Sequence, residues 1–412
     1  MLSAKTIETI KATVPALEIY GEAITKRFYE MMFTNHPELL NIFNHMNQKQ
    51  GRQQGALANT VYAAAQHIDK LEQIIPVVKQ IAHKHRSLGV KPEHYPIVGE
   101  HLLLAIKDVL GDAATDEIID AWGEAYGVIA QAFISIEKEM YDEAEQQEGG
   151  WAGFRTFVVD KKVTESTAIT SFYLKPQDTQ LLPSFLPGQY ISVKISDPGE
   201  QYTHIRQYSL SDAPGKDYYR ISVKRERGNN YPDGKVSNYL HNQIKEGDTL
   251  EISAPAGDFT LNMNTTIPVV LISGGVGLTP MVSMLNTVAE KQPERDVTFI
   301  HAAINGEHHA LRDSVEKLTQ EKKHVKSFIC YEAPTEKDRA AGNYDKEGYI
   351  DLPWLKEVLQ SNEADFYFCG PLPFMKAIRS ALLEWGVPQN RIHFEFFGPA
   401  VNLDKKEEVT QN

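Results

Sequence analysis

The chain has 412 residues, of which 42% are hydrophobic and 24% are charged, and its formal net charge at pH 7 is −13. This length predicts two or three domains with cores of their own, and the acidic balance argues against nucleic acid as a partner. The sequence lacks an apolar run of about 18 residues and a signal-peptide core, and its two cysteines, Cys330 and Cys369, are far apart, which predicts a cytoplasmic protein without stable membrane association.

Residues 1–147 carry apolar side chains at helical spacing and few turn clusters. The spacing is clear between Ile7 and Leu17 and again between Ile118 and Ile129. Helix starts are indicated by the stretch Asn35-His36-Pro37-Glu38, a cap followed by proline, and by Asp69 with Glu72, which resembles a capping box. This part is predicted to be all-α.

Four of the fourteen histidines lie within residues 83–101, which raises the question of a metal site. A structural zinc site typically takes four Cys or His ligands in closely spaced pairs, and no cysteine lies near this stretch. Gly89 fits the left-handed residue that ends a helix. His85 would then lie in the last turn of that helix, with Tyr95 near the start of the next one. One histidine presented in this way suits the axial ligand of a haem.

The acidic and then glycine-rich run 143–155 ends the last helix and predicts a linker. Short β-rich runs separated by Gly, Pro, Asp and Asn follow it, and they predict an antiparallel barrel over residues 151–262. These runs cover residues 154–160, 169–176, 188–196, 206–212, 218–226 and 248–259.

The pattern changes again in residues 263–412. The strand-like run 267–273 leads into "GGVGLTP" (274–280) and a predicted helix, and the runs 296–304, 327–333 and 364–371 predict further strands that alternate with helices. Such alternation predicts a doubly wound α/β domain. A glycine loop between a strand and a helix is the context that phosphate binding needs.

Six motifs in this order resemble the ferredoxin-reductase-like flavoprotein family: "PGQY" (187–190), "RQYS" (206–209), "GKVSNYL" (234–240), "GGVGLTP" (274–280), "CGP" (369–371) and "FEFFGP" (394–399). Taken alone, "QYSL" could be an ordinary strand with alternating polarity. The series of six favours the flavoprotein.

The resemblance implies specific roles in binding FAD. Arg206 would form a charge-assisted fork to the pyrophosphate, Tyr208 would face the isoalloxazine ring, and Ser209 would bond a ring nitrogen. The helix opened by "GKVSN" would offer its first amides to the pyrophosphate. The other positions implied for FAD are Tyr190, Gln207, Gly234, Val236, Ser237, Phe396, Phe397, Gly398 and Pro399.

The resemblance also implies a site for NAD(P)H. Its positions would be Gly274, Gly275, Val276, Gly277, Leu278, Thr279 and Cys369. Cys369 could equally be a buried strand cysteine, and no thiol chemistry is expected of it. Neither a clear ribose-binding acid nor a clear phosphate-binding arginine follows residue 304, where Arg312 is only a candidate. The choice between NADH and NADPH therefore stays open.

The helical part resembles a bacterial globin over its full length, and a globin fused to such a reductase is the flavohaemoglobin architecture. The resemblance makes His85 the proximal ligand of haem b, and it places Tyr29 and Gln53 on the distal side. Leu57 shares a helix face with Gln53, and Phe43 would pack on the haem plane. Without the resemblance, Tyr29 would be read as an ordinary core tyrosine.

The family's catalytic set implied here is His85, Tyr95 and Glu137. A carboxylate that accepts the imidazole N–H gives the ring imidazolate character. From periodicity alone, Glu137 could instead share a solvated helix face with Glu139. Lys84 and Glu395 match positions that influence the redox centres. The remaining histidines of the cluster are expected at the surface or as caps: His83, His94 and His101.

The resemblance implies a monomeric nitric oxide dioxygenase without an obligatory protein partner. NAD(P)H would reduce FAD, FAD would reduce the haem, and nitric oxide and O2 would be converted to nitrate. Two alternatives stay open. One is an oxygen or nitric oxide sensor, which should carry an output module. The other is a reductase of lipid peroxides or quinones, which a roomy distal pocket would admit.

Overall fold

The computed structural model describes residues 2–43, 52–228 and 232–398. It forms two compact units. The first holds the residues up to Arg155 together with Ser192–Arg206 and Glu251–Asp258, and the second holds the rest.

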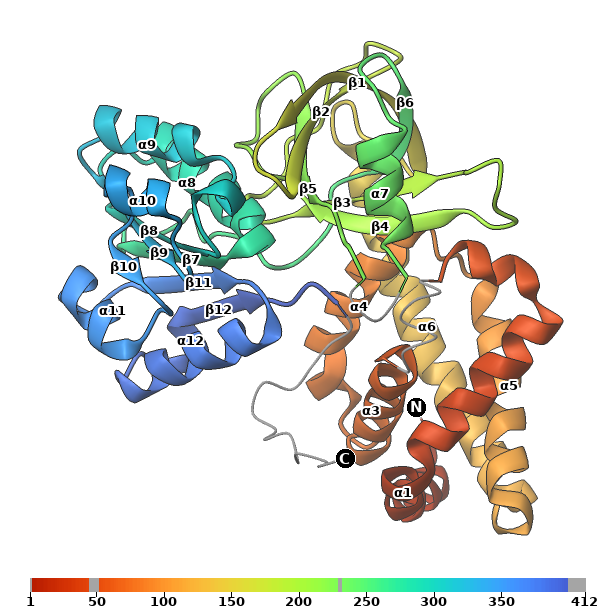
Figure 1. Cartoon of the computed structure of the whole chain (residues 1–412). Coiled ribbons are helices and arrows are strands. Elements are labelled where there is room, and N and C mark those ends of the chain that lie inside the picture. Colours follow the sequence, from red (N-terminus) through yellow and green to blue (C-terminus); the bar gives the residue numbers. More distant parts are fainter. Residues whose placement is uncertain (1, 44–51, 229–231, 399–412) are drawn as a thin grey trace. The chain divides into compact units, whose positions relative to one another are not determined.

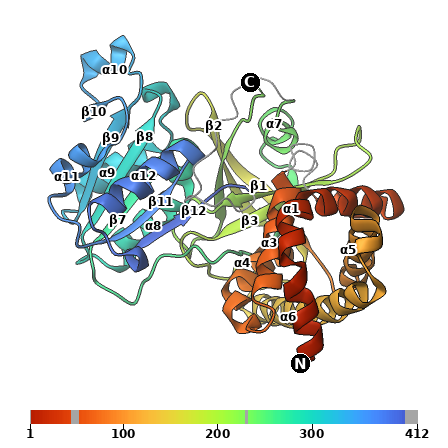
Figure 2. The same cartoon turned by 90° about the horizontal axis from the view of Figure 1, so that it is seen from below.

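The described chain up to Gln146 is entirely helical, as predicted, and appears in Figures 1 and 2 as coiled ribbons from red to light orange. Helix α1 packs against α3, α5 and α6, and α4 packs against α6. The helices are α1 (Ala4–Asn35), α3 (Arg52–Gln66), α4 (Ile75–Leu88), α5 (His94–Leu110) and α6 (Asp116–Gln146), with 3-10 turns η1 (Pro37–Asn41), η2 (Leu71–Ile74) and η3 (Gly111–Ala113).

Local capping explains where several of these helices begin and end. The Ser3 hydroxyl accepts from the Thr6 amide at the start of α1, and Thr115 does the same for Ile118 at the start of α6. Gly89 ends α4 with φ +80°, the left-handed conformation predicted for it.

One predicted helix start is wrong in detail and the other is confirmed. Asp69 and Glu72 form no capping box, because the turn there begins at Leu71 without a side-chain cap and the Asp69 carboxylate pairs with Lys11 at 2.6 Å. The turn η1 begins at Pro37, with His36 as its N-cap and proline in its first turn, as the stretch Asn35-His36-Pro37-Glu38 predicts.

The barrel strands occur at all six predicted runs. The sheet has the order β4-β3-β6-β1-β2-β5, and the pairs β1–β2, β2–β5 and β3–β6 are antiparallel. A bridge between Leu210, just beyond β4, and Ile221 in β5 joins the two edge strands, which closes the sheet. The elements are β1 (Phe154–Thr164), β2 (Ile169–Pro176), β3 (Tyr190–Ile195), β4 (His204–Ser209), β5 (Tyr219–Lys224), α7 (Lys235–Asn242) and β6 (Thr249–Ser253).

The last part of the chain is a parallel sheet of order β10-β9-β8-β7-β11-β12. Helices α8 and α9 cover one face and α11 and α12 the other (Figure 1). The strands are β7 (Val269–Gly274), β8 (Val297–Ala303), β9 (Val325–Tyr331), β10 (Lys346–Glu347), β11 (Asp365–Cys369) and β12 (Ile392–Glu395). The helices are α8 (Leu278–Lys291), α9 (Arg312–Glu321), α10 (Glu336–Ala341), α11 (Leu352–Leu359) and α12 (Leu372–Glu384), with 3-10 turns η4 (Gly275–Gly277), η5 (Gly306–His308) and η6 (Gln389–Arg391).

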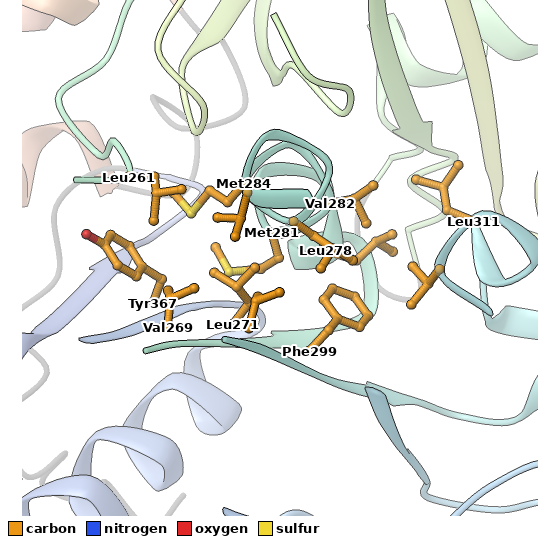
Figure 3. Close-up of a cluster of buried hydrophobic side chains, with 14 of the residues drawn as sticks. Leu261, Val269, Leu271, Leu278, Met281, Val282, Met284, Phe299, Leu311 and Tyr367 are labelled. Carbon is orange, nitrogen blue, oxygen red and sulfur yellow. The ribbon is translucent and has the colours of Figure 1, made fainter. Parts of the chain in front are cut away.

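Helix α8 is the best-buried helix of this part, because every residue from Leu278 to Ala289 is buried. Figure 3 shows Leu278 and Met281 of α8 above Leu271 and Phe299 of the sheet. A helix packed on all sides cannot shift without opening a cavity. The glycine turn that leads into α8 is therefore held firmly at the carboxyl end of β7.

Candidate functional site

Three helices bring His85, Tyr95 and Glu137 together. His85 lies in the last turn of α4, Tyr95 near the start of α5 and Glu137 within α6. The Glu137 Oε1 atom lies 2.7 Å from His85 Nδ1 and accepts the Tyr95 hydroxyl at 2.6 Å. The Tyr95 hydroxyl also lies 3.2 Å from His85 Nδ1. The carboxylate is thus shared by the imidazole and the phenol.

Burial makes this group unlike a surface ion pair. Glu137 is 3% exposed, so the alternative of a solvated helix face does not describe it, whereas Glu139 is exposed. Burial, followed by the bond to Glu137, raises the pKa of Tyr95, so the phenol stays protonated and donates.

The hydrogen bonds define which ring nitrogen of His85 is available. A carboxylate only accepts, so Nδ1 carries the proton and Nε2 keeps its lone pair. Among the described residues, none bonds His85 Nε2. Metal-bound histidines typically show this arrangement, with one nitrogen bonded to a carboxylate and the other free for the metal.

The surroundings fit a haem better than a bare metal ion. In the described ranges no group of three His, Cys, Asp or Glu side chains could hold a metal. A haem can be held by a single histidine. The apolar residues Phe43 and Leu57 are only half-buried although they pack on the helical core. Helix α3 has no fully buried side chain among residues 53–63. These are surfaces that a flat apolar group would cover.

Tyr29, which is expected on the distal side, lies beside Phe43 in the structure. Tyr29 is 5% exposed on α1, and its ring centroid lies 5.8 Å from that of Phe43. Gln53 and Leu57 lie half-buried on α3, the helix that packs on α1.

The sequence prediction missed Phe133 and was wrong about one histidine. The Phe133 ring lies 5.6 Å from the His85 ring, and its position one turn before Glu137 was the available signal. His101 is 2% exposed rather than at the surface, because its two ring nitrogens bond the Asn35 side chain and the Ile97 carbonyl. His94 does cap, accepting from the Lys91 amide. His83 is half-buried, which lowers its pKa.

Lys84 neighbours His85 in α4. Burial, and next the positive charge of Arg206, lowers the pKa of the Lys84 ammonium. Burial and the neighbouring Arg206 both disfavour the charged form of Lys84. An anionic group bound near both side chains would stabilise their charges.

The residues expected to hold FAD lie at adjoining ends of β3 and β4. The Leu210 amide, directly after Ser209, donates to the Gln189 carbonyl, directly before Tyr190, at 2.9 Å. Three successive residues of β4, Arg206 to Tyr208, are half-buried, whereas Ser209 is buried. A barrel strand usually alternates, so three partly open positions in a row indicate a surface that receives a ligand.

Within the described part of the chain, no side chain caps the start of α7, where the chain is closely packed. Gly234 is its N-cap, and a side chain there would come within 2.8 Å of both Glu226 and Ser237. The other end is neutralised by Lys162, whose ammonium donates to the carbonyls of Leu240, His241 and Ile244 at 3.2, 2.8 and 2.7 Å.

The glycine turn η4 lies against β11. A Cβ on Gly277 would be 2.2 Å from the Cys369 carbonyl oxygen, and Gly275 has φ +54°. Gly274, Val276, Leu278 and Thr279 complete the turn and the start of α8. Cys369 is fully buried, and burial raises the pKa of its thiol, which agrees with the expectation of no thiol chemistry.

The aromatic end of β12 pairs with β11, where Glu395 is the partner of Cys369. Phe396 is half-buried and Phe397 is 43% exposed, with Gly398 next to it. An exposed phenylalanine at this edge has a face available for a planar ring. Pro399 lies outside the described residues.

Known protein families match all three parts. A globin model matches residues 26–133, an oxidoreductase FAD-binding domain residues 156–261, and an oxidoreductase NAD-binding domain residues 271–380. A flavohemoprotein of Bacillus thuringiensis subsp. konkukian (strain 97-27) is 65% identical, with 98% of this chain and 100% of the relative covered. One from Bacillus subtilis (strain 168) is 58% identical over 98% and 99%.

Solved structures agree with these relatives. A flavohemoglobin from Malassezia yamatoensis with bound FAD and haem has a TM-score of 0.83 and 30% identity, covering 96% of this chain and 100% of that one. The FAD/NAD-binding domain of a nitric oxide dioxygenase from Vibrio cholerae has a TM-score of 0.54 and 41% identity, covering 60% and 99%.

The fold and the site define a haem-binding globin joined to an oxidoreductase that binds FAD and a nicotinamide nucleotide. The histidine that a carboxylate orients belongs to the globin, and the glycine turn belongs to the oxidoreductase. The chain belongs to the flavohemoprotein family. In the part of the chain described, no helix could cross a membrane.

Proposed function

We propose that the protein is a nitric oxide dioxygenase that uses NAD(P)H, FAD and haem to convert nitric oxide and O2 to nitrate. The observation that carries the proposal is the 2.7 Å contact between His85 Nδ1 and the buried Glu137 Oε1. A globin that only stores oxygen needs no carboxylate behind its proximal histidine, whereas one that activates oxygen gains from a more basic imidazole.

The protein's own residues supply binding, orientation and charge. The bound cofactors supply hydride acceptance, one-electron transfer and oxygen binding. Glu137 and Tyr95 hold the His85 ring in one tautomer, which leaves Nε2 as the atom that would bind the haem iron. Tyr29 and Gln53 would donate hydrogen bonds to a ligand above the haem, with Phe43 and Leu57 forming its apolar walls.

On the reductase side, we assign Arg206, Tyr208 and Ser209 to the flavin, together with the start of α7. The turn η4 would receive the pyrophosphate of the nicotinamide nucleotide through its amides. Phe397 would cover the flavin ring until the nicotinamide replaces it. Lys84 and Glu395 would tune the redox centres.

We further propose three domains over residues 1–147, 151–262 and 263–412, acting as a cytoplasmic monomer without an obligatory partner. Both cysteines are free and buried, which suits a reducing compartment.

The test is to mix purified holoprotein with NADH, O2 and nitric oxide, and to follow nitric oxide with an electrode and nitrate by ion chromatography. We expect rapid removal of nitric oxide and nitrate as the product. Faster turnover with a lipid hydroperoxide or a quinone than with nitric oxide would favour the reductase alternative. Binding without turnover would favour the sensor.

A further inference from the structure

Helix α8 begins at the glycine turn proposed for the nicotinamide nucleotide, and farther along the helix two side chains bond the barrel. Ser283 and Asn286 are three residues apart and share one face of α8. The Asn286 side-chain amide donates to Asp212 Oδ1 at 2.8 Å, and the Ser283 hydroxyl donates to the Asp212 carbonyl at 2.7 Å. All three residues belong to the second compact unit and are buried. A single barrel residue therefore accepts two hydrogen bonds from α8.

Asp212 lies just beyond β4, the strand that carries the residues proposed for the flavin. It stands three residues after Ser209, the last residue of β4. Its carboxylate is also held from the barrel side, because Oδ1 accepts the Ala213 amide and Oδ2 accepts the Tyr218 hydroxyl, each at 2.8 Å. Arg220 Nη1 lies 3.5 Å from Oδ2. A buried carboxylate is costly unless it is paired and hydrogen-bonded, so these partners fix Asp212 in one orientation.

Helix α8 also contacts the chain just before β3, where Tyr190 is proposed for the flavin. Gly188 stands two residues before Tyr190, with φ +107°, a conformation that glycine adopts without strain. A Cβ on Gly188 would lie 2.7 Å from the Met284 Cε atom and 2.2 Å from the Phe259 carbonyl oxygen. Met284 is labelled on α8 in Figure 3. The helix thus packs closely on both strand ends at which flavin residues are proposed.

The remaining faces of α8 do not allow it to move independently of its sheet. Every residue from Leu278 to Ala289 is buried, and a close-packed helix transmits a displacement along its length. The position of α8 against Asp212 therefore sets where the glycine turn η4 lies relative to β4. Hydride transfer needs the reacting atoms about 3–3.5 Å apart, and a misplacement of about 1 Å can cost roughly 100-fold in rate.

We infer that Asp212 is a positioning residue for hydride transfer: through Asn286 and Ser283 it holds α8, and with it the nicotinamide nucleotide, at the distance from the flavin that the reaction requires. In this step a hydride leaves the reduced nicotinamide with its two electrons and reduces the flavin. Asn286 lies eight residues beyond Leu278, about 12 Å along the helix, so it acts on the turn through the helix. The inference rests on the sites proposed for the flavin and the nucleotide.

A role in stability alone would be the alternative, and Thr287 provides the matched control. Thr287 is the next residue of α8 and is buried as well, but its hydroxyl donates at 2.7 Å to the Ser283 carbonyl of its own helix. Thr287→Val removes this bond within α8. Asn286→Ala removes a bond to the barrel, while Asp212 keeps its partners there. The two variants therefore separate the stability of the helix from its attachment to the barrel.

The experiment uses the full-length holoprotein. Anaerobic stopped-flow reduction of the flavin over a series of NADH concentrations gives the limiting rate constant and the Kd for NADH separately. Hydrogen–deuterium exchange without nucleotide, in peptides covering 207–213 and 274–290, reports the contact itself and does not depend on turnover. Urea unfolding of the same samples gives their stability.

Asn286→Ala should lower the limiting rate constant by about 10- to 100-fold, with FAD retained and the Kd for NADH changed by less than about 2-fold, the pattern of an interaction that acts on the transition state. Exchange should rise in both peptides. Ser283→Ala, a smaller change, should act in the same direction. Thr287→Val should keep the wild-type limiting rate constant, with faster exchange only in 274–290.

Several outcomes would overturn the inference. Equal slowing in Asn286→Ala and Thr287→Val would assign the effect to the stability of α8. A wild-type limiting rate constant in both Asn286→Ala and Ser283→Ala would show that the contact does not position the nucleotide, and so would a weaker affinity for NADH with an unchanged limiting rate constant. The proposed function survives all of these results, because NADH still reduces the flavin. Failure of NADH to reduce the flavin of the wild-type protein would instead contradict the proposed function.

Discussion

At the scale of single residues, Glu137 and Glu139 show how much two positions of one helix can differ. They are two residues apart in α6, yet Glu137 is 3% exposed and Glu139 is open to solvent. A buried carboxylate is costly unless it is hydrogen-bonded, and here the His85 ring and the Tyr95 hydroxyl both bond it. These two hydrogen bonds stabilise the buried Glu137 carboxylate. A substitution of Glu137 should therefore affect activity through the His85 ring.

Glu137→Gln should leave haem and FAD bound but slow the removal of nitric oxide by roughly 10–100-fold, as is typical when the partner of a metal-bound histidine is lost. The amide keeps the size and an acceptor oxygen but lacks the charge that makes the imidazole more basic. Stopped-flow turnover at saturating NADH measures the effect. Glu139→Gln is the control, and equal rates in the two variants would remove Glu137 from the mechanism.

Tyr29→Phe should speed the loss of O2 from the reduced protein. A hydrogen bond contributes about 0.5–1.5 kcal/mol, so the dissociation rate should rise by about 2- to 13-fold. Flash photolysis provides the measurement. Tyr20→Phe, at a 46% exposed position of the same helix, should leave the rate unchanged. A Tyr29 variant with the wild-type rate would mean that its hydroxyl does not reach the ligand.

At the scale of elements, the turn before α8 needs glycine at position 277 because there is no room for a side chain. Gly277 has φ −60° and ψ −8°, a conformation that any residue adopts. A side chain is excluded because its Cβ would lie 2.2 Å from the Cys369 carbonyl oxygen. The turn can therefore approach β11 closely only because it has no side chain there, and α8, buried on all sides, cannot retreat.

Gly277→Ala should weaken binding of the nicotinamide nucleotide and lower the free energy of unfolding, because either the glycine turn or β11 must move to make room for the methyl group. Overpacking of this kind typically costs about 1–3 kcal/mol. Nucleotide titration and urea unfolding of the same samples give both numbers. Gly127→Ala on α6, where a Cβ meets nothing within 4 Å, should instead stabilise by about 0.5–1 kcal/mol. If Gly277→Ala also stabilised the protein, the close approach of the turn to β11 would not be what excludes a side chain at this position.

At the scale of the whole molecule, the proposed haem ligand His85 and the nucleotide motifs belong to different stretches of chain. Residues 26–133 match a globin, and residues 156–261 and 271–380 match the two oxidoreductase domains. The residues proposed for haem and those proposed for the nucleotides thus lie in different stretches of the chain. Each site should therefore survive loss of the other. Electron transfer between them should not.

His85→Ala should lose or badly weaken haem binding yet keep FAD and reduce a soluble dye with NADH. Arg206→Ala should do the reverse, releasing FAD while the haem spectrum and its ligand binding persist. Neither should remove nitric oxide efficiently. Absorption spectra and dye reduction measure the two halves independently. A His85 variant that retained FAD but could not reduce the dye would show that the flavin site requires the haem.

The sequence by itself determined the all-α first part, the six barrel strands, the alternating α/β part and the glycine turn. These follow from local rules: apolar periodicity over one helix or strand, and the backbone freedom of a residue such as Gly89, whose φ is +80°. The edge strands β10 and β12 escaped prediction, because two or four residues carry too little periodicity to be recognised without their neighbours.

Tertiary structure alone decided which polar side chains are buried and with whom they pair. Periodicity could not separate Glu137 from Glu139. His101 was expected at the surface or as a cap, although Asn35 and Ile97 bond it in the interior. In each case the partner comes from a distant segment, and the free energy of burying a polar group depends on that partner rather than on the neighbouring sequence.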